Sequence, residues 1–316
     1  MPTTKLKDLT DAPELLSGGH AACPGCAGPV IIRQALLAAQ QDDVRVVVVM
    51  ATGCMEVSTT IYPNSAWRVP FFHSAFENAA ATISGAEAAY RSLKKQGKLS
   101  GEVRFIAMGG DGGTYDIGLQ SLSGALERGH NFTYICYDNE AYMNTGIQRS
   151  GATPCGANTT TAPAGTVSSG KPQQKKNLTM IAAAHGAPYV AQAAPHRARD
   201  LMRKVQAAVA VEGPAFINVL SPCPRGWRYP PEQTIQMCKL AVDTCVWPLF
   251  EIVDGRLKIT VKPREKKPVE EWLKSQGRFK HLFTPKNQHM IQEIQAQVDA
   301  NWEGLLRREE FDSKEA

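Results

Sequence analysis

The chain has 316 residues, of which 43% are hydrophobic and 21% are charged, and its formal net charge is +5 at pH 7. This composition is that of a globular protein and excludes disorder of the whole chain. The length allows one large α/β domain or two smaller ones. The small, evenly spread positive charge does not indicate binding to nucleic acid.

Neither a membrane-spanning nor a secreted protein is predicted. The longest apolar run, Val46–Ala51, is far shorter than the ~20 residues that a membrane-spanning helix needs. Residues 1–17 carry several charges and lack the apolar stretch of a signal peptide. We therefore predict a cytoplasmic protein with no membrane partner, in which the eight cysteines are thiols or metal ligands rather than disulfides.

Short apolar runs alternate with longer stretches of helical periodicity, a pattern typical of β-α-β units on a parallel sheet. The predicted strands, apolar enough to be buried on both faces, are Val44–Met50, Val103–Met108, Phe132–Tyr137, Tyr189–Ala191 and Ala215–Leu220. The predicted helices between them are Pro29–Gln40, Glu77–Gln96, Tyr115–Arg128, Leu178–His185 and Arg197–Val211. The predicted fold class is therefore α/β, a mostly parallel sheet with helices on both faces.

Two segments interrupt this alternation. Ile147–Lys176 is rich in Gly, Thr, Ser, Ala and Pro and is too long for an ordinary connection, so we predict a functional loop or lid. It ends in a predicted basic patch of Lys171, Lys175 and Lys176.

The composition changes again after Pro222. A last amphipathic helix has Ile291, Ile294, Val298, Trp302 and Leu305 on one face. We predict one domain over residues 1–230 and a C-terminal extension over 231–316, which packs on that domain or on a partner subunit.

A glycine-rich turn, Gly109-Gly110-Asp111-Gly112-Gly113, directly follows the predicted strand Val103–Met108. In a parallel sheet the carboxyl ends of strands border the ligand crevice, and a glycine-rich turn lets backbone N–H groups approach a phosphate. An Asp in the turn adds a hard oxygen ligand for Mg²⁺. The turn is neither a Walker P-loop nor a GxGxxG dinucleotide motif.

The next predicted strand, Phe132–Tyr137, ends just before Asn139, which lies 28 residues after Asp111. Because one helix joins the two strands, their carboxyl ends lie side by side, and Asp111 and Asn139 can share one metal ion. This pair resembles the motif of the thiamine-diphosphate enzymes, which begins with Gly-Asp-Gly and ends with Asn. The resemblance implies that Asp111 and Asn139 bind Mg²⁺ through their side chains and Ala141 through its carbonyl. It also places Gly110, Gly112, Gly113 and Thr145 in the cofactor-binding site.

Four cysteines form a second candidate site. Cys23 and Cys26 form a CxxC motif, while Cys54 and Cys223 follow the predicted strands Val44–Met50 and Ala215–Leu220. Because both strands end at the edge that carries the Gly-Asp-Gly turn, four thiolates can converge beside the diphosphate crevice. Such a site accommodates either Zn²⁺ or a [4Fe–4S] cluster.

The two sites together resemble those of one narrower family. Five stretches carry the likeness: Cys23-Pro-Gly-Cys26, Ala51-Thr-Gly-Cys54, Gly109-Gly-Asp-Gly-Gly113, Tyr137-Asp-Asn-Glu-Ala-Tyr-Met-Asn-Thr-Gly146 and Pro222-Cys-Pro224. They closely resemble the thiamine-diphosphate (beta) subunits of pyruvate:ferredoxin oxidoreductase and related 2-oxoacid oxidoreductases. The likeness covers nearly the whole chain.

This resemblance implies a complete set of functional assignments. Cys23, Cys26, Cys54 and Cys223 hold a [4Fe–4S] cluster, Cys54 lies beside the cofactor, and Asn144 is the catalytic residue that hydrogen-bonds the substrate oxygen. The implied partners are a pyrimidine-binding alpha subunit that completes the active site, a gamma subunit, and a ferredoxin-like subunit or domain that leads to ferredoxin.

The substrate stays open at this point. A small 2-oxoacid is expected, with pyruvate first and oxalate second, and the use of coenzyme A and the subunit stoichiometry are not readable from the chain. A non-redox thiamine-diphosphate lyase with structural zinc is the alternative from another class.

Overall fold

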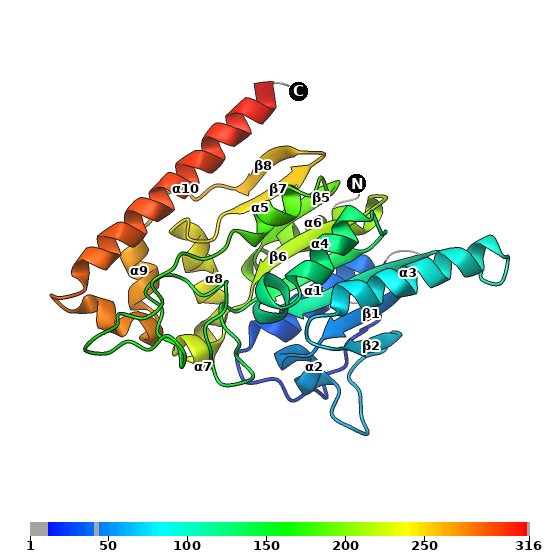
Figure 1. Ribbon diagram of the computed structural model, residues 1–316, viewed down its shortest axis with the longest axis horizontal. Coiled ribbons are helices and arrows are strands. Elements are labelled where there is room, and N and C mark those ends of the chain that lie inside the picture. The colour runs from blue at the N-terminus through cyan, green and yellow to red at the C-terminus, as the bar shows by residue number, and fades with distance from the viewer. Residues whose placement is uncertain (1–11, 41–43, 315–316) are drawn as a thin grey trace.

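The computed structural model describes residues 12–40 and 44–314. The strands within these residues form one eight-stranded sheet (Figure 1). Its strand order is β2-β1-β3-β4-β6-β5-β7-β8. The strands are β1 (Arg45–Ala51), β2 (Phe71–Ser74), β3 (Val103–Gly110), β4 (Thr133–Asp138), β5 (Tyr189–Ala193), β6 (Ala215–Leu220), β7 (Leu249–Val253) and β8 (Arg256–Val261). The six strands from β2 to β5 pair in parallel, and β7 and β8 join antiparallel.

The predicted α/β class is confirmed, and all five predicted strands are present. The bounds of β6 agree to the residue, because Ala215–Leu220 is buried along its whole length and bounded by polar or turn residues. Three strands were not predicted. β2 is only four residues long and half exposed, while β7 and β8 include the charged Glu251 and Lys258, which interrupt their apolar pattern.

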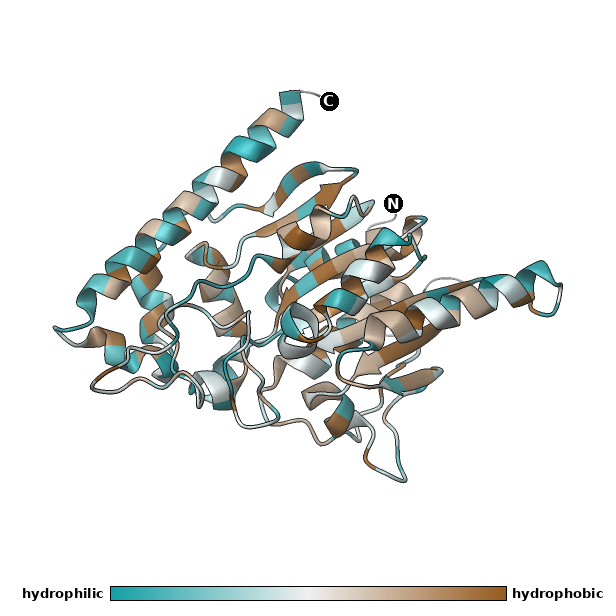
Figure 2. Cartoon of the chain, viewed as in Figure 1, coloured by the Kyte–Doolittle hydropathy of each residue, from teal (hydrophilic) through white to brown (hydrophobic). Residues whose placement is uncertain are grey.

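Helices cover both faces of the sheet (Figures 1 and 2). On one face α1 (Ala27–Ala39) and α6 (Ala198–Ala210) share a hydrophobic core with the sheet. On the other face the core includes α3 (Ala79–Lys95), α4 (Leu119–Glu127), α5 (Leu178–Ala183) and part of α10 (Gln288–Lys314). The brown strands of Figure 2 lie between these layers, as expected for strands buried on both faces.

The helix predictions differ from the structure mainly near the glycine-rich turn. The predicted helix Tyr115–Arg128 is instead a π-helical turn, Gly112–Asp116, followed by α4. Two glycines and a wider turn let the backbone stay at the sheet edge before the regular helix begins, and π turns are frequent at functional sites. The helices α2 (Cys54–Thr59), α7 (Pro224–Trp227) and α9 (Val269–Lys274) were not predicted, and a further helix, α8 (Thr234–Asp243), lies in the C-terminal segment.

The C-terminal segment packs on the rest of the chain. Its strands β7 and β8 extend the same sheet, and α10 lies along β8 (Figure 1). The backbone N–H groups of Leu257 and Ile259 on this edge strand donate to the carboxylates of Asp312 and Glu309 on α10. The edge is therefore covered, which opposes pairing with a foreign strand. The division at residue 230 stays a prediction.

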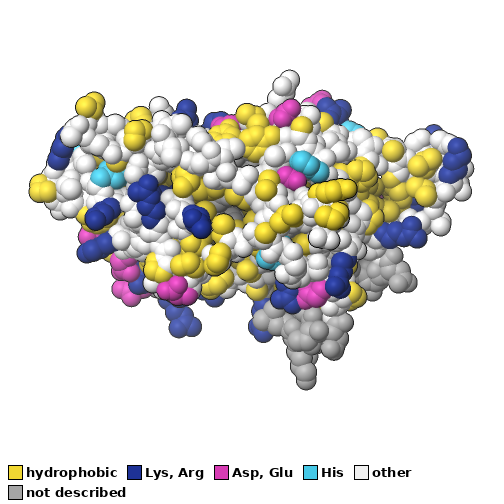
Figure 3. Space-filling view, turned by 90° about the horizontal axis from the view of Figure 1, so that it is seen from below, with side chains coloured by type: hydrophobic (Ala, Val, Ile, Leu, Met, Phe, Trp, Pro, Cys, Tyr) yellow, Lys and Arg dark blue, Asp and Glu magenta, His cyan; other side chains and the backbone are white. Residues whose placement is uncertain are grey.

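Within the described residues, no helix is both long enough and apolar enough to cross a bilayer. Residues 1–11, on which most of the argument against a signal peptide rests, lie outside the described part. On the face shown in Figure 3, Lys and Arg side chains are interspersed with hydrophobic and acidic ones.

Candidate functional site

The two residues of the predicted metal pair lie at neighbouring strand ends. Asp111 follows β3 and Asn139 follows β4, and these strands pair in parallel with Gly110 opposite Tyr137. Both side chains are buried. The structure therefore brings together the two positions whose spacing suggested a shared site.

Three polar groups converge between these strand ends. One terminal atom of the Asn139 amide lies 2.9 Å from Asp111 Oδ1 and 2.8 Å from the carbonyl oxygen of Ala141. With the amide nitrogen at that place, it donates to both oxygens; after a half-turn of the amide, three oxygens face one another. In octahedral coordination at 2.0–2.1 Å, adjacent oxygens lie about 2.9 Å apart. The two separations from the Asn139 amide thus fit those between oxygen ligands of one Mg²⁺ ion.

Two glycines of the turn are required by close packing. A Cβ atom at Gly112 would lie 2.5 Å from the Tyr142 ring, and one at Gly113 would lie 2.9 Å from the carbonyl oxygen of Phe76. No side chain fits at either position without a shift of the neighbouring chain. The turn therefore keeps its backbone at the sheet edge, where N–H groups can face an anion.

A cavity of about 120 Å³ opens above this turn, and nearly all of the predicted cofactor-site residues line it. They are Cys54, Gly110, Asp111, Gly112, Asn139, Ala141, Asn144 and Thr145. Thr52, Gly53, Phe76, Tyr137, Tyr142 and Met143 complete the lining, while Gly113 is not part of it. The Asn144 side chain is exposed and makes no hydrogen bond with the described residues, so it does not cap the turn Tyr142–Gly146.

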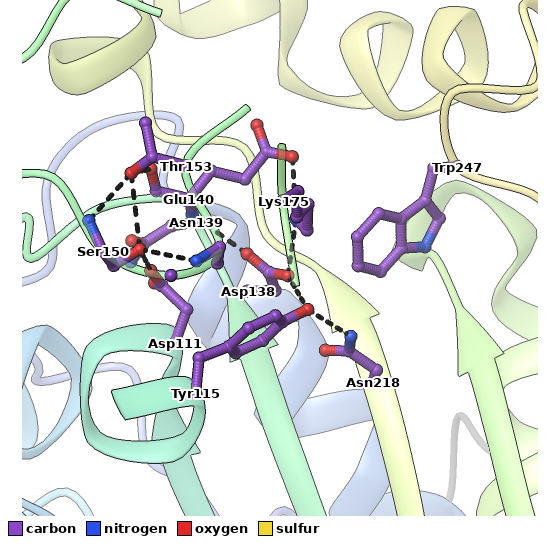
Figure 4. A network of polar contacts seen from close by, with 12 residues as sticks. Asp111, Tyr115, Asp138, Asn139, Glu140, Ser150, Thr153, Lys175, Asn218 and Trp247 are labelled. Carbon is purple, nitrogen blue, oxygen red and sulfur yellow. Dashed lines mark hydrogen bonds and ion pairs between the residues drawn. The ribbon is translucent and has the colours of Figure 1, made fainter. Parts of the chain in front are cut away.

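A network of polar groups surrounds Asp111 and Asn139 (Figure 4). Lys175 Nζ lies 2.7 Å from Asp138 Oδ2 and 2.9 Å from Glu140 Oε1, and 4.7 Å from the centre of the Trp247 ring. The hydroxyl of Tyr115 donates to Asp138 Oδ2 at 2.6 Å. Burial lowers the pKa of Lys175, but the charges of Asp138 and Glu140 outweigh it and raise the pKa overall. This ammonium group therefore stays charged and pairs with the carboxylates on either side of Asn139.

Glu140 is held in a conformation that residues other than glycine rarely adopt. Its φ is 69°, and its carbonyl oxygen accepts a hydrogen bond from Thr153 Oγ1 at 2.6 Å. Its carboxylate also binds Arg278, 2.5 Å away and fully buried. Burial alone would raise the pKa of Glu140, but the charges of Lys175 and Arg278 hold it below its ordinary value. Such backbone strain costs about 1–3 kcal/mol and persists because these contacts fix the turn that presents Asn139 and Ala141.

The predicted basic patch at the end of the long loop is wrong for two of its three lysines. Lys171 is 1% exposed, and Lys175, with a side chain 22% exposed, pairs with buried carboxylates. Only Lys176 is exposed, and it pairs with Asp116. Lys171 Nζ donates to the carbonyl oxygen of Thr153 at 2.5 Å. The loop lysines therefore bind the loop to the site instead of forming a charged surface.

We expect Lys171 to make stability depend on pH. Burial lowers the pKa of Lys171 from 10.5 to about 8. Between these values the unfolded chain binds a proton that the folded chain has released, so folding stability rises with pH across this window. The measurement is the free energy of unfolding in urea, taken as the value for the wild type minus that for Lys171→Met. This difference should increase from pH 8 to pH 10 and stay constant below pH 7. A difference that is independent of pH would contradict this.

The four predicted cluster ligands lie in one neighbourhood. Cys26 is the residue before α1, Cys54 is the first residue of α2, and Cys223 is the residue before α7, with the Gly226 N–H donating to its Sγ at 3.4 Å. Cys23 lies one turn before Cys26, and its carbonyl oxygen accepts a hydrogen bond from the Cys26 N–H. Three of the four sulfurs thus lie at helix N-termini, where the backbone favours negative charge.

The cysteines also influence one another electrically. Burial, together with the nearby Cys223, Cys26 and Cys23, raises the pKa of the Cys54 thiol to about 12. Burial raises the pKa of Cys26 to about 11, with contributions from Cys223 and Cys23. Over residues 12–40 and 44–314, however, no three Cys, His, Asp or Glu side chains are spaced as ligands of one metal ion. The four thiols thus interact electrostatically, but within the described residues they do not form a closed single-ion site.

The sequence did not identify several residues of the site. Ser150, Thr153 and Lys175 come from the long loop, which was predicted to be functional without a role for each residue, and Arg278 comes from the C-terminal segment. The run Asp138-Asn139-Glu140 directly after a buried strand was a usable signal, because buried acids require partners. The partners themselves follow no local pattern.

Comparisons with known proteins agree with this arrangement. The family described as "Thiamine pyrophosphate enzyme, C-terminal TPP binding domain" matches residues 51–219. Pyruvate synthase subunit PorB of Thermotoga maritima is 52% identical over 93% of this chain and 92% of its own. PorB of Methanocaldococcus jannaschii is 53% identical over 90% of this chain and 94% of its own.

A solved structure shares the fold at low sequence identity. It is a 2-oxoglutarate:ferredoxin oxidoreductase from Magnetococcus marinus, with a TM-score of 0.54 and 20% identity, covering 76% of this chain and 77% of that chain. The fold, the strand-end site and the identity to curated relatives all point the same way. The chain belongs to the family of thiamine-diphosphate-binding (beta) subunits of the 2-oxoacid:ferredoxin oxidoreductases.

Proposed function

We propose that this chain is the thiamine-diphosphate-binding subunit of an enzyme that oxidatively decarboxylates pyruvate and passes the electrons through a [4Fe–4S] cluster to ferredoxin. One observation carries the proposal: Cys54 lines the same cavity as Asp111 and Asn139. A thiol from the four-cysteine neighbourhood is therefore part of the wall of the cofactor site. The names of the PorB relatives, pyruvate synthase subunits, support pyruvate as the substrate.

The proposed cofactor site uses this chain's strand ends. Asp111 Oδ1, the Asn139 amide oxygen and the Ala141 carbonyl would bind Mg²⁺, whose other ligands include diphosphate oxygens. Gly110, Gly112, Gly113 and Thr145 would hold the diphosphate at the turn. Thiamine diphosphate, when bound, supplies the electron sink for loss of CO₂ from a 2-oxoacid. Asn144, exposed to the cavity, would hydrogen-bond the substrate oxygen on which negative charge develops.

The proposed cluster site uses Cys23, Cys26, Cys54 and Cys223. Thiolates bind iron, and a cationic iron centre would offset the burial and mutual repulsion that raise the pKa of Cys54 and Cys26. The Gly226 N–H bond to Cys223 Sγ is the kind of contact that tunes a cluster's potential. In this arrangement the electron acceptor would lie next to the cofactor.

The proposal includes partners. A pyrimidine-binding alpha subunit would complete the active site, and a gamma subunit and a ferredoxin-like subunit or domain would lead electrons to ferredoxin. The proposed location is the cytoplasm.

The test is an anaerobic absorption spectrum of the purified complex with an iron and zinc assay, before and after pyruvate or oxalate is added. We expect about four irons per copy of this chain in addition to those of any ferredoxin-like subunit, and visible absorbance that bleaches with pyruvate. Bleaching with oxalate alone would assign oxalate as the substrate. Zinc without iron would contradict the redox function and favour a thiamine-diphosphate lyase.

Replacing Cys54 by Ala should remove the cluster. The matched control is Cys155→Ala, because Cys155 is half buried in the long loop and donates to the Pro172 carbonyl oxygen. We expect the iron content of the Cys54→Ala complex to fall by about four per copy of this chain, while that of the control is unchanged. Full iron content in Cys54→Ala would exclude Cys54 as a ligand.

A further inference from the structure

The two carboxylate oxygens of Asp111 have different surroundings. Oδ1 lies 2.9 Å from the Asn139 amide, on the side where the oxygen ligands converge. Oδ2 accepts a hydrogen bond from Ser150 Oγ at 2.5 Å. Asp111 and Ser150 are each 1% exposed, so bulk water does not compete for this bond. One oxygen therefore faces the cation position, and the other is occupied by a hydroxyl group.

The direction of the Ser150 hydroxyl is fixed by its own loop. The backbone N–H of Ala152 donates to Ser150 Oγ at 3.1 Å, so the hydroxyl proton is left to point at Asp111. The backbone N–H of Ser150 donates to Thr153 Oγ1 at 2.9 Å. Thr153 Oγ1 in turn donates to the carbonyl oxygen of Glu140. The turn that contains Ser150 and Thr153 thus forms hydrogen bonds with the chain at the ends of both β3 and β4, the strands that carry the proposed cation ligands (Figure 4).

We propose that Ser150 determines the cation specificity of the site. Because its hydroxyl group occupies Oδ2, Asp111 stays a monodentate ligand, which favours Mg²⁺ over Ca²⁺. This inference rests on the proposed cation site. Mg²⁺ requires near-ideal octahedral geometry, in which adjacent ligands subtend about 90°. The two oxygens of a bidentate carboxylate cannot subtend an angle of about 90° at the cation. Ca²⁺, in contrast, accepts bidentate carboxylates and six to eight ligands. Ser150 is a positioning residue, because it acts through Asp111.

The variant Ser150→Ala tests this proposal. It frees Oδ2, so Asp111 can turn both oxygens toward the cation, which lowers the affinity for Mg²⁺ more than that for Ca²⁺. Loss of such an outer partner typically costs ~10–100-fold in metal affinity. We expect the ratio of the Ca²⁺ to the Mg²⁺ dissociation constant to fall by about tenfold. The measurement is retention of labelled thiamine diphosphate by the cation-stripped multi-subunit complex, titrated separately with each cation.

Two variants separate a specific effect from a general one. Ser168→Ala makes the same change in the same loop, where Ser168 Oγ donates to the Gly170 carbonyl oxygen, and should leave both constants unchanged. Ser150→Thr keeps a hydroxyl group and should keep the wild-type ratio. If Ser150→Ala lowers the affinities for both cations by the same factor, or changes neither affinity, Ser150 has no role in specificity and the proposal is wrong.

A further variant covers failure of Ser150→Ala to fold. Ser150→Cys is close to the size of serine but is a much weaker donor, and it should lower the ratio in the same direction. An unchanged ratio there would also contradict the proposal. If the wild-type complex shows no cation-dependent retention of thiamine diphosphate, the proposed function itself fails. Normal retention with an insensitive ratio refutes only the role of Ser150.

Discussion

Replacing Asp111 by Ala should abolish retention of thiamine diphosphate by the purified complex. Asp111 supplies the one charged oxygen of the proposed cation site, and the remaining two oxygens are neutral amide and carbonyl groups. We expect the cofactor affinity to fall by more than ~100-fold, beyond the ~10–100-fold that loss of an outer partner costs. Cofactor content is measured by release and chromatography after gel filtration.

The stability of this variant is equally informative. Burial raises the pKa of Asp111 well above its ordinary value, and the nearby charge of Asp138 raises it further. Removing this carboxyl group relieves an unfavourable burial but leaves the buried Ser150 hydroxyl without its acceptor, so the unfolding temperature of the cofactor-free variant reports which of the two effects is larger. Asp299→Ala, on the outer helix α10, is the matched control and should retain the cofactor. A variant at position 111 that binds normally would refute the cation site.

Replacing Arg278 by Met should destabilise the fold more than any surface change. Arg278 is 2% exposed, its guanidinium binds the Glu140 carboxylate, and it lies 4.0 Å from the centre of the Trp227 ring. Breaking one side of a buried ion pair costs about 3–5 kcal/mol, because the other charge stays buried without full compensation. We expect a loss of this size in the free energy of unfolding, measured with urea on the purified chain.

The pairing itself can be checked by a second substitution. Adding Glu140→Gln to Arg278→Met removes the orphaned charge and should restore part of the lost stability. Arg307→Met serves as the control, since Arg307 pairs with Glu303 on the exposed side of α10 and such pairs contribute about 0–1 kcal/mol. Equal losses in Arg278→Met and in Arg307→Met would show that the buried pair has no special weight.

The sequence predicted those parts of the fold and site that depend on local pattern. The buried strand Ala215–Leu220 was predicted with its observed bounds, and the strand ends after β3 and β4 brought Asp111 and Asn139 together as expected. Both depend on apolar runs and on the rule that parallel strands end at the same edge. The ligand roles of these residues stay predictions.

The parts that the sequence did not predict depend on contacts between distant segments. The four-residue β2 pairs with β1 although three of its residues are not buried, so burial gave no signal. Lys175 looked like part of a solvated basic patch because its two carboxylate partners lie 37 and 35 positions earlier. The hydrogen bond between Arg278 and Glu140 spans 138 positions. No periodicity or motif encodes such a pair.

The span between Glu140 and Arg278 also has a consequence for synthesis of the chain on the ribosome. Strands β1 to β6 are complete by residue 220, so the parallel sheet can form while the C-terminal part is still being made. Until Arg278 emerges, the left-handed turn at Glu140 lacks one of its two cationic partners. We therefore expect the turn at Glu140 to reach its final conformation only after residue 278 has been synthesised, later than the parallel strands.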